Sequence, residues 1–283
     1  MKKYILFNPA AGRGKGRESA EKLKDILAED ELAFYDITEI KDYRVLLEDV
    51  INGDDIIICG GDGTLNRFVN DTNGLEFNNN IWFFSAGTGN DFLNDLGKKE
   101  DEPPFLVNKY IKDLPVAVIN GKNYKFLNAI GYGLDGYCCE EGDRQREKNK
   151  KKINYTTIAI KGLFFFYKPV NAKVTVDGKS YAFKKVWIAP AMKGRFYGGG
   201  MMAAPAQDRL AEDRKVTLVI ASGSGRLKTL MFFPSIFTGE HVKRTDIVSI
   251  FTGHNITVEF DRPASLQVDG ETILNVSKYS VKA

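Results

Sequence analysis

The sequence predicts an α/β domain with a parallel sheet, followed by a domain built mainly of antiparallel β-strands. From the N-terminus, short apolar runs typical of strands alternate with segments of helical periodicity, which is the pattern of a parallel sheet covered by helices. After about residue 125 the chain changes to alternating runs bounded by Gly, Asn and Asp, which is typical of antiparallel strands and tight turns. We therefore expect the domains to comprise residues 1–127 and 128–283.

The elements of each domain follow from this pattern. In the first domain, strands are expected at residues 3–7, 32–37, 55–59, 81–85 and 116–119, and helices at 19–27 and 45–51. In the second, we expect strands at residues 173–176, 184–190, 215–221, 255–260, 264–271 and 279–283. The last strand has an alternative place in the sheet of the first domain. The linker is not rich in Pro or Ser, so we expect the domains to pack together around a ligand-binding cleft.

Composition and charge restrict the class of protein. The 283 residues carry a formal charge of only +3, which by itself gives no support for a nucleic-acid partner. The 3 cysteines form no CxxC pair and no spaced disulfide framework, as expected in a reducing cytoplasm. The longest strongly apolar stretch, residues 162–167, is far shorter than the roughly 20 residues that span a bilayer. We therefore expect a cytoplasmic protein without a transmembrane helix.

A glycine-rich turn joins one predicted strand to a predicted helix. The strand at residues 55–59 runs into the sequence GGDGT, and apolar residues at helical spacing follow directly. Unpaired backbone N–H groups and the helix dipole favour an anion at such a helix N-terminus, and glycines let a phosphate approach the backbone. Asp62 would repel a phosphate unless a divalent cation lies between them, as in a nucleotide bound with Mg²⁺. The alternative is a tight turn without a ligand.

Two further loops are expected at the same edge of the sheet. NPAAGRGKG follows the first strand and SAGTGNDF follows the strand at residues 81–85, and the carboxyl ends of parallel strands share one rim. The side chains of these loops that offer charge or hydrogen bonds to a nucleotide are Arg13, Lys15, Thr88 and Asn90. Asp91 either supplies a second carboxylate near the metal or caps the helix that follows it. Both histidines, His241 and His254, lie in polar sequence and are expected to be exposed.

Several motifs, taken in order, carry a resemblance to a known family. The chain resembles the diacylglycerol kinase catalytic family, in particular its soluble bacterial lipid kinases, in the motifs NPAAG (8–12), GGDGTLN (60–66), GTGNDF (87–92), GGGMMAAPA (198–206) and VDGE (268–271). The resemblance implies a Rossmann-like nucleotide-binding domain, similar to those of NAD kinases and phosphofructokinases, and a C-terminal β-sandwich domain. It also implies Mg²⁺-dependent transfer of the γ-phosphoryl group of ATP to a lipid hydroxyl.

The same resemblance implies roles for individual residues. The ATP site would comprise Asn8, Arg13, Thr38, Gly60, Gly61, Asp62, Gly63, Thr64, Leu65, Asn66 and Thr88. Glu271 would be the general base, and Asp62 and Asp91 would organise the catalytic Mg²⁺. The chemistry agrees for Glu271, since a carboxylate within hydrogen-bond reach can take the proton of an alcohol during phosphoryl transfer. A simple β-turn at residues 269–271 is the alternative interpretation, and the two are compatible.

One departure from the family concerns a second, structural Mg²⁺. The resemblance implies Leu210, Asp213 and Lys215 as its ligands, through one side chain and two backbone carbonyls. Arg214 stands where the family often has glycine. A guanidinium beside a cation is unfavourable, and a residue other than glycine rarely takes a left-handed backbone conformation. Whether this site is kept stays open.

The expected activity is that of a lipid kinase acting on diacylglycerol or a related lipid alcohol. A kinase of a soluble acceptor, similar to NAD kinase, is one alternative, but GTGNDF together with the distal DGE argues against it. A catalytically silent regulator that binds nucleotide or lipid is another, and the retained acids Asp62, Asp91 and Glu271 argue against that. Diacylglycerol, sphingoid bases, ceramide and polyprenols all present an alcohol beside apolar chains, and the sequence does not select among them.

A basic run followed by an aromatic run suggests contact with a membrane surface. Residues 144–152 read RQREKNKKK, with one acid among six basic residues, and Phe164–Tyr167 follow. We expect peripheral contact with the inner membrane surface through these two segments, because basic residues attract anionic lipids and aromatic side chains favour the headgroup level. The alternative is a solvated charged loop followed by a buried core segment. A homodimer is a further expectation.

Overall fold

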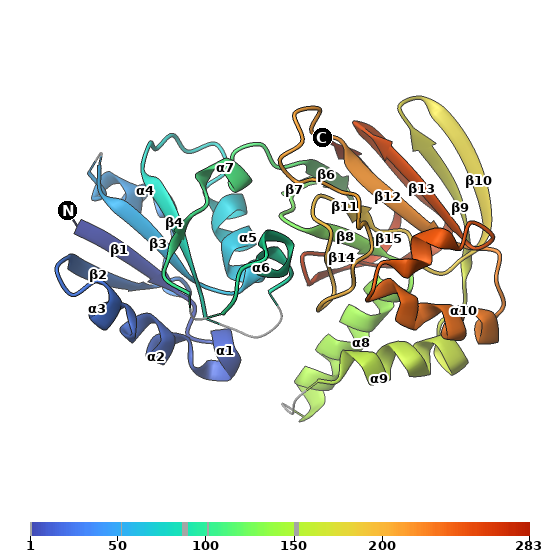
Figure 1. Ribbon diagram of the computed structural model, residues 1–283, viewed down its shortest axis with the longest axis horizontal. Helices are drawn as coiled ribbons and strands as arrows, with labels where there is room; N and C mark the ends of the chain where they lie inside the picture. Colours follow the sequence, from blue (N-terminus) through green and yellow to red (C-terminus); the bar gives the residue numbers. More distant parts are fainter. Residues whose placement is uncertain (1, 52, 87–89, 101, 150–152) are drawn as a thin grey trace. The chain divides into compact units, whose positions relative to one another are not determined.

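The computed structural model describes residues 2–51, 53–86, 90–100, 102–149 and 153–283 (Figure 1). The chain separates into two compact units, Met1–Asp113 and Leu114–Ala283. Among the described residues, no helix is both long enough and apolar enough to cross a bilayer.

The first unit contains a five-stranded sheet in the order β2-β1-β3-β4-β5. Its parallel strands are β1 (Lys2–Phe7), β2 (Glu31–Asp36), β3 (Asp55–Gly60) and β4 (Asn80–Ser85), and β5 (Phe105–Leu106) is antiparallel to β4. Every residue of β3 is buried, as expected for a central strand with both faces of the sheet covered. The parallel α/β architecture that the sequence predicts is confirmed.

The helices of the first unit differ from the expectation in their details. They are α1 (Ala11–Gly14), α2 (Gly16–Glu21), α3 (Leu23–Ile26), α4 (Tyr43–Glu48), α5 (Asp62–Asp71), α6 (Asp91–Leu96) and α7 (Asn108–Ile111). The helix expected at residues 19–27 is divided between α2 and α3, and the NPAAGRGKG segment contains α1 rather than being all loop. Ala20 and Leu23 pack in one core cluster with Ile5 and Ile57 of the sheet.

The order of the strands defines where a ligand can bind. From β1 the chain moves to β2 on one side and then to β3 on the other, so β1 and β3 flank the point at which the strand order reverses. In open parallel sheets, ligands bind in the crevice at the carboxyl ends of the strands at such a point. The loops after β1 and β3 begin at this crevice.

The second unit is built on an antiparallel sheet. Its strands are β6 (Val116–Ile119), β7 (Lys122–Lys125), β8 (Ala129–Tyr132), β9 (Val170–Val176), β10 (Lys179–Val186), β11 (Ala191–Met192), β12 (Val216–Ala221), β13 (Val248–Gly253), β14 (Asn255–Val268) and β15 (Glu271–Lys282). β14 pairs with β9 through its first half and with β8 through its second half, with a register shift between Glu259 and Ala264. One bent strand therefore joins two layers, and the expected β-sandwich is confirmed.

The boundary between the two units differs from the expected one, whereas the last strand lies in the domain in which it was expected. The two units divide at Asp113, before the expected residue 127, because β6 pairs with β15 and forms a hairpin with β7. The last strand, β15, pairs with β14 and β6 and so stays in the second unit, because its alternating buried side chains belong to that core.

The helices of the second unit were largely absent from the sequence-based expectation. They are α8 (Leu134–Asn149), α9 (Tyr155–Lys161), the π-helix η1 (Gly162–Phe166), α10 (Arg226–Phe232) and the 3₁₀ helices η2 (Phe233–Ile236) and η3 (Glu240–Lys243). Helices α8 and α9 pack against each other (Figure 1). The basic run from Arg144 begins inside α8, so the charged-loop alternative is wrong for residues 144–149. Arg144 pairs with Glu140, and Arg146 with Asp143, at helical spacing.

Candidate active site

Hydrogen bonds join the loops that follow β1, β3 and β4. The N–H of Asn8 donates to the carbonyl of Cys59 at 3.2 Å, and its side-chain Nδ2 donates to Thr64 Oγ1 at 3.3 Å. The N–H of Ala86 donates to the carbonyl of Gly60 at 3.0 Å. The three loops therefore form one structure at the crevice where the strand order reverses.

The glycines of GGDGT have different roles. A Cβ atom on Gly60 would lie 2.3 Å from Thr64 Oγ1 and 2.6 Å from Thr64 Cβ, so the packing of the first turn of α5 requires glycine there. A Cβ atom on Gly63 would meet nothing within 4 Å. Gly63 instead leaves open space beside the N-terminus of α5, where the helix dipole favours an anion. The fold therefore requires glycine at position 60 but not at position 63.

The acidic residues of the site begin two neighbouring helices. Asp62 is the first residue of α5, and its Oδ2 accepts a hydrogen bond of 3.0 Å from the N–H of Phe92 in the first turn of α6. Asp91, the first residue of α6, is only 6 % exposed. The hydrogen bond from Phe92 thus brings the starts of both helices together.

The donor set at these helix starts fits a nucleotide-borne Mg²⁺. Within the described ranges, no group of three or more His, Cys, Asp or Glu side chains could hold a metal by itself. Mg²⁺ is usually held by one or two carboxylates together with substrate phosphates rather than by a cage of protein ligands. Asp62 and Asp91 supply two carboxylates of this kind.

The other residues expected at the ATP site have distinct environments. Thr38 follows β2 and donates from Oγ1 to Asp36 Oδ1 at 2.7 Å, in an exposed turn. Leu65 is fully buried, and its N–H donates to the carbonyl of Gly61 at 3.2 Å. Asn66 is buried, and its Oδ1 accepts a hydrogen bond from Asn70 Nδ2 at 3.0 Å. Thr88 and the side chain of Arg13 lie outside the described part of the chain.

Glu271 follows a tight turn in the second unit. Asp269 and Gly270 have φ values of 46° and 95° and connect β14 to β15, with Val268 paired to Glu271. The turn is anchored because the Asp269 carboxylate accepts hydrogen bonds from the N–H groups of Leu127, Asn128 and Ala129. The β-turn interpretation of VDGE is therefore correct. Glu271 itself is exposed, which leaves its carboxylate accessible to a substrate.

The sequence analysis did not identify a buried acid in the second unit. Asp135, in the first turn of α8, is 8 % exposed and accepts a hydrogen bond of 2.9 Å from the hydroxyl of Tyr197. Burial raises the pKa of Asp135 to about 7. The signal in the sequence is an acid between glycines, GLDG, directly after the buried strand β8.

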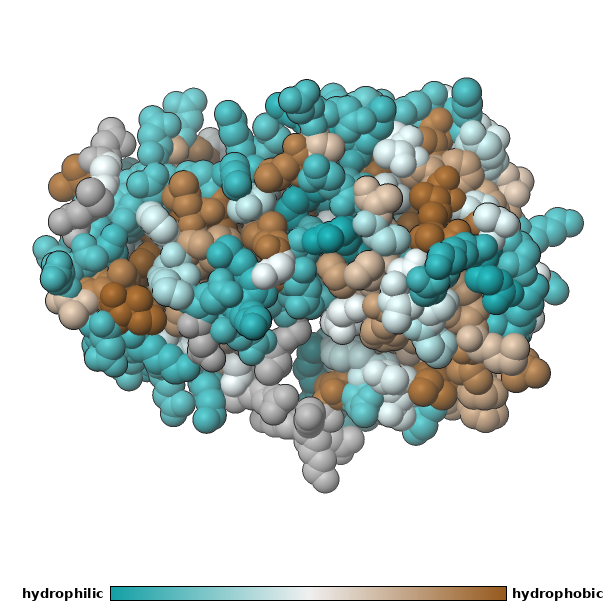
Figure 2. All heavy atoms as spheres, viewed as in Figure 1, coloured by the Kyte–Doolittle hydropathy of each residue, from teal (hydrophilic) through white to brown (hydrophobic). Residues whose placement is uncertain are grey.

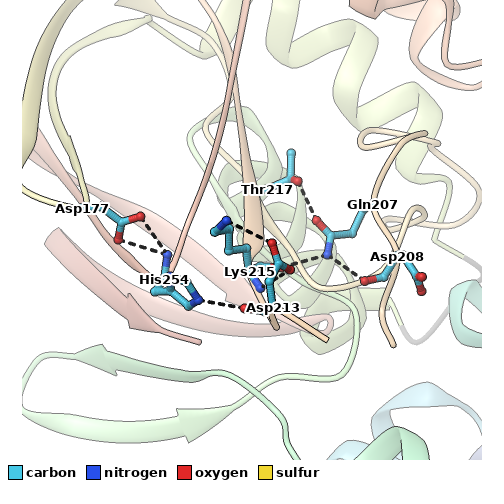
Figure 3. A network of polar contacts seen from close by, with 7 residues as sticks. All are labelled: Asp177, Gln207, Asp208, Asp213, Lys215, Thr217 and His254. Carbon is cyan, nitrogen blue, oxygen red and sulfur yellow. Dashed lines mark hydrogen bonds and ion pairs between the residues drawn. The ribbon is translucent and has the colours of Figure 1, made fainter. Parts of the chain in front are cut away.

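Of the three residues expected to hold a structural Mg²⁺, Asp213 and Lys215 take part in a different network (Figure 3), and Leu210 is an exposed residue outside it. Asp213 Oδ2 lies 3.0 Å from Lys215 Nζ, and this partner lowers the pKa of Asp213. The carbonyl of Asp213 is 2.8 Å from His254 Nε2, and the carbonyl of Lys215 accepts from Gln207 Nε2 at 3.0 Å. Arg214 takes a left-handed conformation, with φ of 54°, so the backbone objection does not hold. The carboxylate of Asp213 and the carbonyl of Lys215 therefore already have protein partners.

The two histidines differ in burial. His254 is exposed, as expected, but His241 is 1 % exposed, so the expectation for His241 is wrong. Its Nε2 lies 2.9 Å from the carbonyl of Ala203, and burial lowers its pKa. This contact joins residues far apart in the sequence, which local polarity does not reveal.

Comparison with known proteins agrees with this arrangement. Residues 2–120 match the family model of the diacylglycerol kinase catalytic domain, and residues 128–280 match that of the YegS C-terminal NAD kinase beta sandwich-like domain. The chain is 26% identical to a diacylglycerol kinase of Mycobacterium tuberculosis over 268 residues, which cover 90% of this chain and 84% of the relative. It is 24% identical over 285 residues to a diacylglycerol kinase of Bacillus subtilis, covering 94% and 88%.

A solved structure supports the fold. The crystal structure of a diacylglycerol kinase from Bacillus anthracis is similar with a TM-score of 0.68 and 22% identity, covering 99% of this chain and 93% of that one. The two family models together account for nearly all of the sequence, in the order in which the two units occur. The chain therefore belongs to the diacylglycerol kinase catalytic-domain family.

Proposed function

We propose that this protein is an ATP- and Mg²⁺-dependent lipid kinase that phosphorylates the hydroxyl of diacylglycerol or a related lipid alcohol. The observation that carries the proposal is the hydrogen bond from Phe92 to Asp62, which gathers two acidic helix starts at the crevice of the parallel sheet. This is where an open α/β sheet binds its ligand, and two carboxylates there suit a metal-bound triphosphate.

In this proposal the phosphates of ATP lie at the N-terminus of α5, in the open space beside Gly63. Asp62 and Asp91 would hold the Mg²⁺, which neutralises charge on the phosphates during transfer. The side chain of Asn8 and that of Thr64 are hydrogen-bonded to each other, so together they fix the loop after β1 against the helix start. The loop is thereby preorganised for the nucleotide.

Glu271 is proposed as the general base. An alcohol is a weak nucleophile at neutral pH, and Glu271 takes its proton as the alcohol oxygen bonds to the γ-phosphorus. The bond from that phosphorus to the bridging oxygen of ADP breaks in the same step, and ADP leaves. The three N–H groups that bind Asp269 hold the turn in place, so the carboxylate two residues later is presented from a rigid hairpin.

The proposal is tested by phosphorylation of a panel of acceptors with γ-labelled ATP. Diacylglycerol, a sphingoid base, ceramide and a polyprenol are presented in mixed micelles, and NAD is added as a soluble acceptor. We expect a labelled lipid that depends on Mg²⁺, with diacylglycerol or a related lipid alcohol as the best acceptor. Labelling of NAD alone would assign a soluble-acceptor kinase, and nucleotide binding without ATP consumption would assign a regulator; either result contradicts the proposal.

A further inference from the structure

Three consecutive phenylalanines lie on the surface of the second unit. Phe164, Phe165 and Phe166 end the π-helix η1 and are 39%, 72% and 64% exposed. Their rings contact one another in sequence, with centroids 5.6 Å and 6.2 Å apart. The expectation of a buried core segment holds for Tyr167, which is buried, but is wrong for the three phenylalanines. An exposed apolar cluster of this kind typically marks an interaction surface.

Helix α10 extends this apolar surface. Nη1 of Arg226, the first residue of α10, donates to the carbonyl of Leu163 in η1 at 2.5 Å, so the two helices lie side by side. Leu227 and Met231 of α10 are 67% and 72% exposed. Figure 2 shows apolar spheres gathered over the region in which α9 and α10 lie in Figure 1. We call this surface the apolar shelf; its residues are Ile160, Phe164, Phe165, Phe166, Leu227 and Met231.

Basic residues flank the apolar shelf. Lys161 and Lys168 precede and follow the three phenylalanines, and both are exposed. Neither has an ion-pair partner within the described part of the chain. The arginines of α8 are different, because Arg144 lies 3.1 Å from both Glu140 and Glu141, and Arg146 lies 2.8 Å from Asp143. The positive charge available to a partner is therefore beside the apolar shelf rather than on these arginines.

A pocket opens next to the apolar shelf. Its volume is about 400 Å³, and Phe166, Tyr167, Lys168 and Arg262 contribute to its walls. The hydroxyl of Tyr167 is buried and has no hydrogen-bond partner in the described ranges of the chain, although a buried polar group normally has one. It lies next to Gly133, another wall residue, since a Cβ atom there would be 3.2 Å away.

The chemistry of this pocket suits a phosphate. Lys168 and Arg262 supply positive charge, and the Tyr167 hydroxyl supplies a hydrogen-bond donor. Glu140 also lines the pocket, but its carboxylate is bound by Arg144 and by the hydroxyl of Ser265. Phe166 belongs both to the pocket and to the apolar shelf. A ligand that joins a phosphate to apolar chains would fit the two surfaces together.

We infer that the apolar shelf and this pocket dock the protein on a bilayer of anionic phospholipids. The aromatic side chains enter the headgroup level, and the pocket of Lys168, Arg262 and Tyr167 receives the phosphate of one lipid. The inference rests on the proposed function, since a lipid kinase meets a membrane lipid at the bilayer surface. A second copy of the chain fits less well, because a symmetric contact would place the same lysines opposite each other.

Vesicle co-sedimentation tests the docking. The vesicles are phosphatidylcholine alone or phosphatidylcholine with about one third phosphatidylglycerol, close to the charge of an anionic leaflet. The double variant Phe165→Gln/Phe166→Gln should bind on the order of tenfold less to the anionic vesicles. Lys168→Gln should bind them about fivefold less, with a weaker dependence on salt. The matched controls are Val45→Gln, an equally exposed apolar residue on α4, and Lys179→Gln on β10; both should bind like wild type.

Kinase assays separate this inference from the proposed function. On a short-chain soluble diacylglycerol, both docking variants should turn over at the wild-type rate, whereas on vesicle-borne substrate they should lose activity in step with binding. Unchanged vesicle binding of the Phe165→Gln/Phe166→Gln variant would overturn the inference. So would a concentration-dependent dimer that this variant abolishes without any effect on vesicles. Normal vesicle binding by a wild-type protein that phosphorylates no lipid would leave the docking intact and overturn the proposed function alone.

Discussion

The carboxylate of Asp62 accepts a hydrogen bond from the backbone N–H of Phe92, which is 3.0 Å away. The first turn of a helix contains N–H groups without intrahelical partners, and here one such group of α6 is satisfied by the first residue of α5. Because α5 follows β3 and α6 follows β4, this bond fixes two neighbouring strand ends relative to each other. Asp62 therefore has a structural role besides the proposed catalytic one, and the variants must separate the two.

Replacing Asp62 with Asn should weaken Mg²⁺-dependent ATP binding and turnover together. The amide oxygen of Asn can still accept from Phe92, so the fold is kept while the charge near the metal is lost. Nucleotide binding is measured by calorimetry with and without Mg²⁺. The control is Asp71→Asn at the last residue of α5, where the carboxylate accepts from Arg67 Nε at 3.2 Å, at the opposite end of the helix from Asp62. If ATP binding by the Asp62→Asn variant depends on Mg²⁺ as in wild type, Asp62 has only a structural role.

The glycines of GGDGT should respond differently to alanine. Gly60→Ala places a Cβ atom 2.3 Å from Thr64 Oγ1 and should destabilise the fold by about 1–3 kcal/mol. Gly63→Ala fills open space in an exposed helical position, where alanine is favoured by up to about 1 kcal/mol. Denaturant unfolding of both variants checks these values. If phosphates lie beside Gly63, the Gly63→Ala variant should nevertheless bind ATP more weakly; equal affinity would place the phosphates elsewhere.

Burial of Asp135 should make stability depend on pH. The pKa of its carboxyl is raised from 3.8 to about 7, so between these pH values the folded protein holds a proton that the unfolded chain has lost. Stability therefore falls as pH rises through this range, by up to about 1.4 kcal/mol per pH unit. Asp135→Asn keeps an oxygen that can accept from Tyr197 but removes the titration. The variant should match wild type near pH 4 and exceed it near pH 7.

Asp177 provides a control, because its contribution to the stability of the fold changes with pH in the opposite direction. Hydrogen bonds from the N–H groups of Asn255 and His254 lower the pKa of this exposed carboxylate. Its contribution is present above the pKa of the unfolded chain and is lost as pH falls through the folded value. Asp177→Asn should therefore be less stable than wild type near neutral pH and approach it in acid. If the free energy of unfolding of Asp135→Asn differs from that of wild type by the same amount at every pH from 4 to 7, the pH dependence cannot be assigned to Asp135.

The network around Asp213 predicts that no metal supports the second unit. Lys215 contacts the Asp213 carboxylate, and Gln207 donates to the carbonyl of Lys215, so a chelator should leave the thermal unfolding temperature of this unit unchanged. Lys215→Gln removes the ammonium that lies beside the carboxylate. If a Mg²⁺-dependent rise in unfolding temperature appears in wild type, the interpretation of this network is wrong.

The parts of the fold that the sequence predicts are those in which the local pattern of apolar residues and glycines matches the place of the element in the folded chain. The buried run of β3, the glycines after it and the helical spacing from Leu65 identified the strand, turn and helix at the proposed ATP site. The association of Asp62 with Phe92 was not predictable, because it joins residues 30 positions apart in the sequence through one hydrogen bond. Such contacts follow from the strand order, which local patterns do not determine.

Helix α8 and Asp135 show why the rest could not be predicted. The second half of α8 has few apolar residues, so it lacks the periodic apolar stripe that identifies a helix. In the sequence, Arg144 and Arg146 therefore read as part of a charged run, although in the structure both form ion pairs along the helix. Asp135 is buried, and its partner Tyr197, whose hydroxyl donates to its carboxyl, lies far along the chain. Neither polarity nor spacing reveals a partner at that distance.

The central claim is that Glu271 assists transfer of phosphate from ATP to a lipid hydroxyl. Its most direct test is the rate at which γ-labelled ATP labels diacylglycerol in mixed micelles, for wild type, Glu271→Gln and the control Glu259→Gln on the same hairpin. We expect wild type and Glu259→Gln to label the lipid at similar rates. The Glu271→Gln variant should bind ATP normally but transfer label about 10²-fold more slowly or worse, because the proton has no base to receive it. Wild-type turnover by the Glu271→Gln variant, with ATP bound equally well, would contradict the claim.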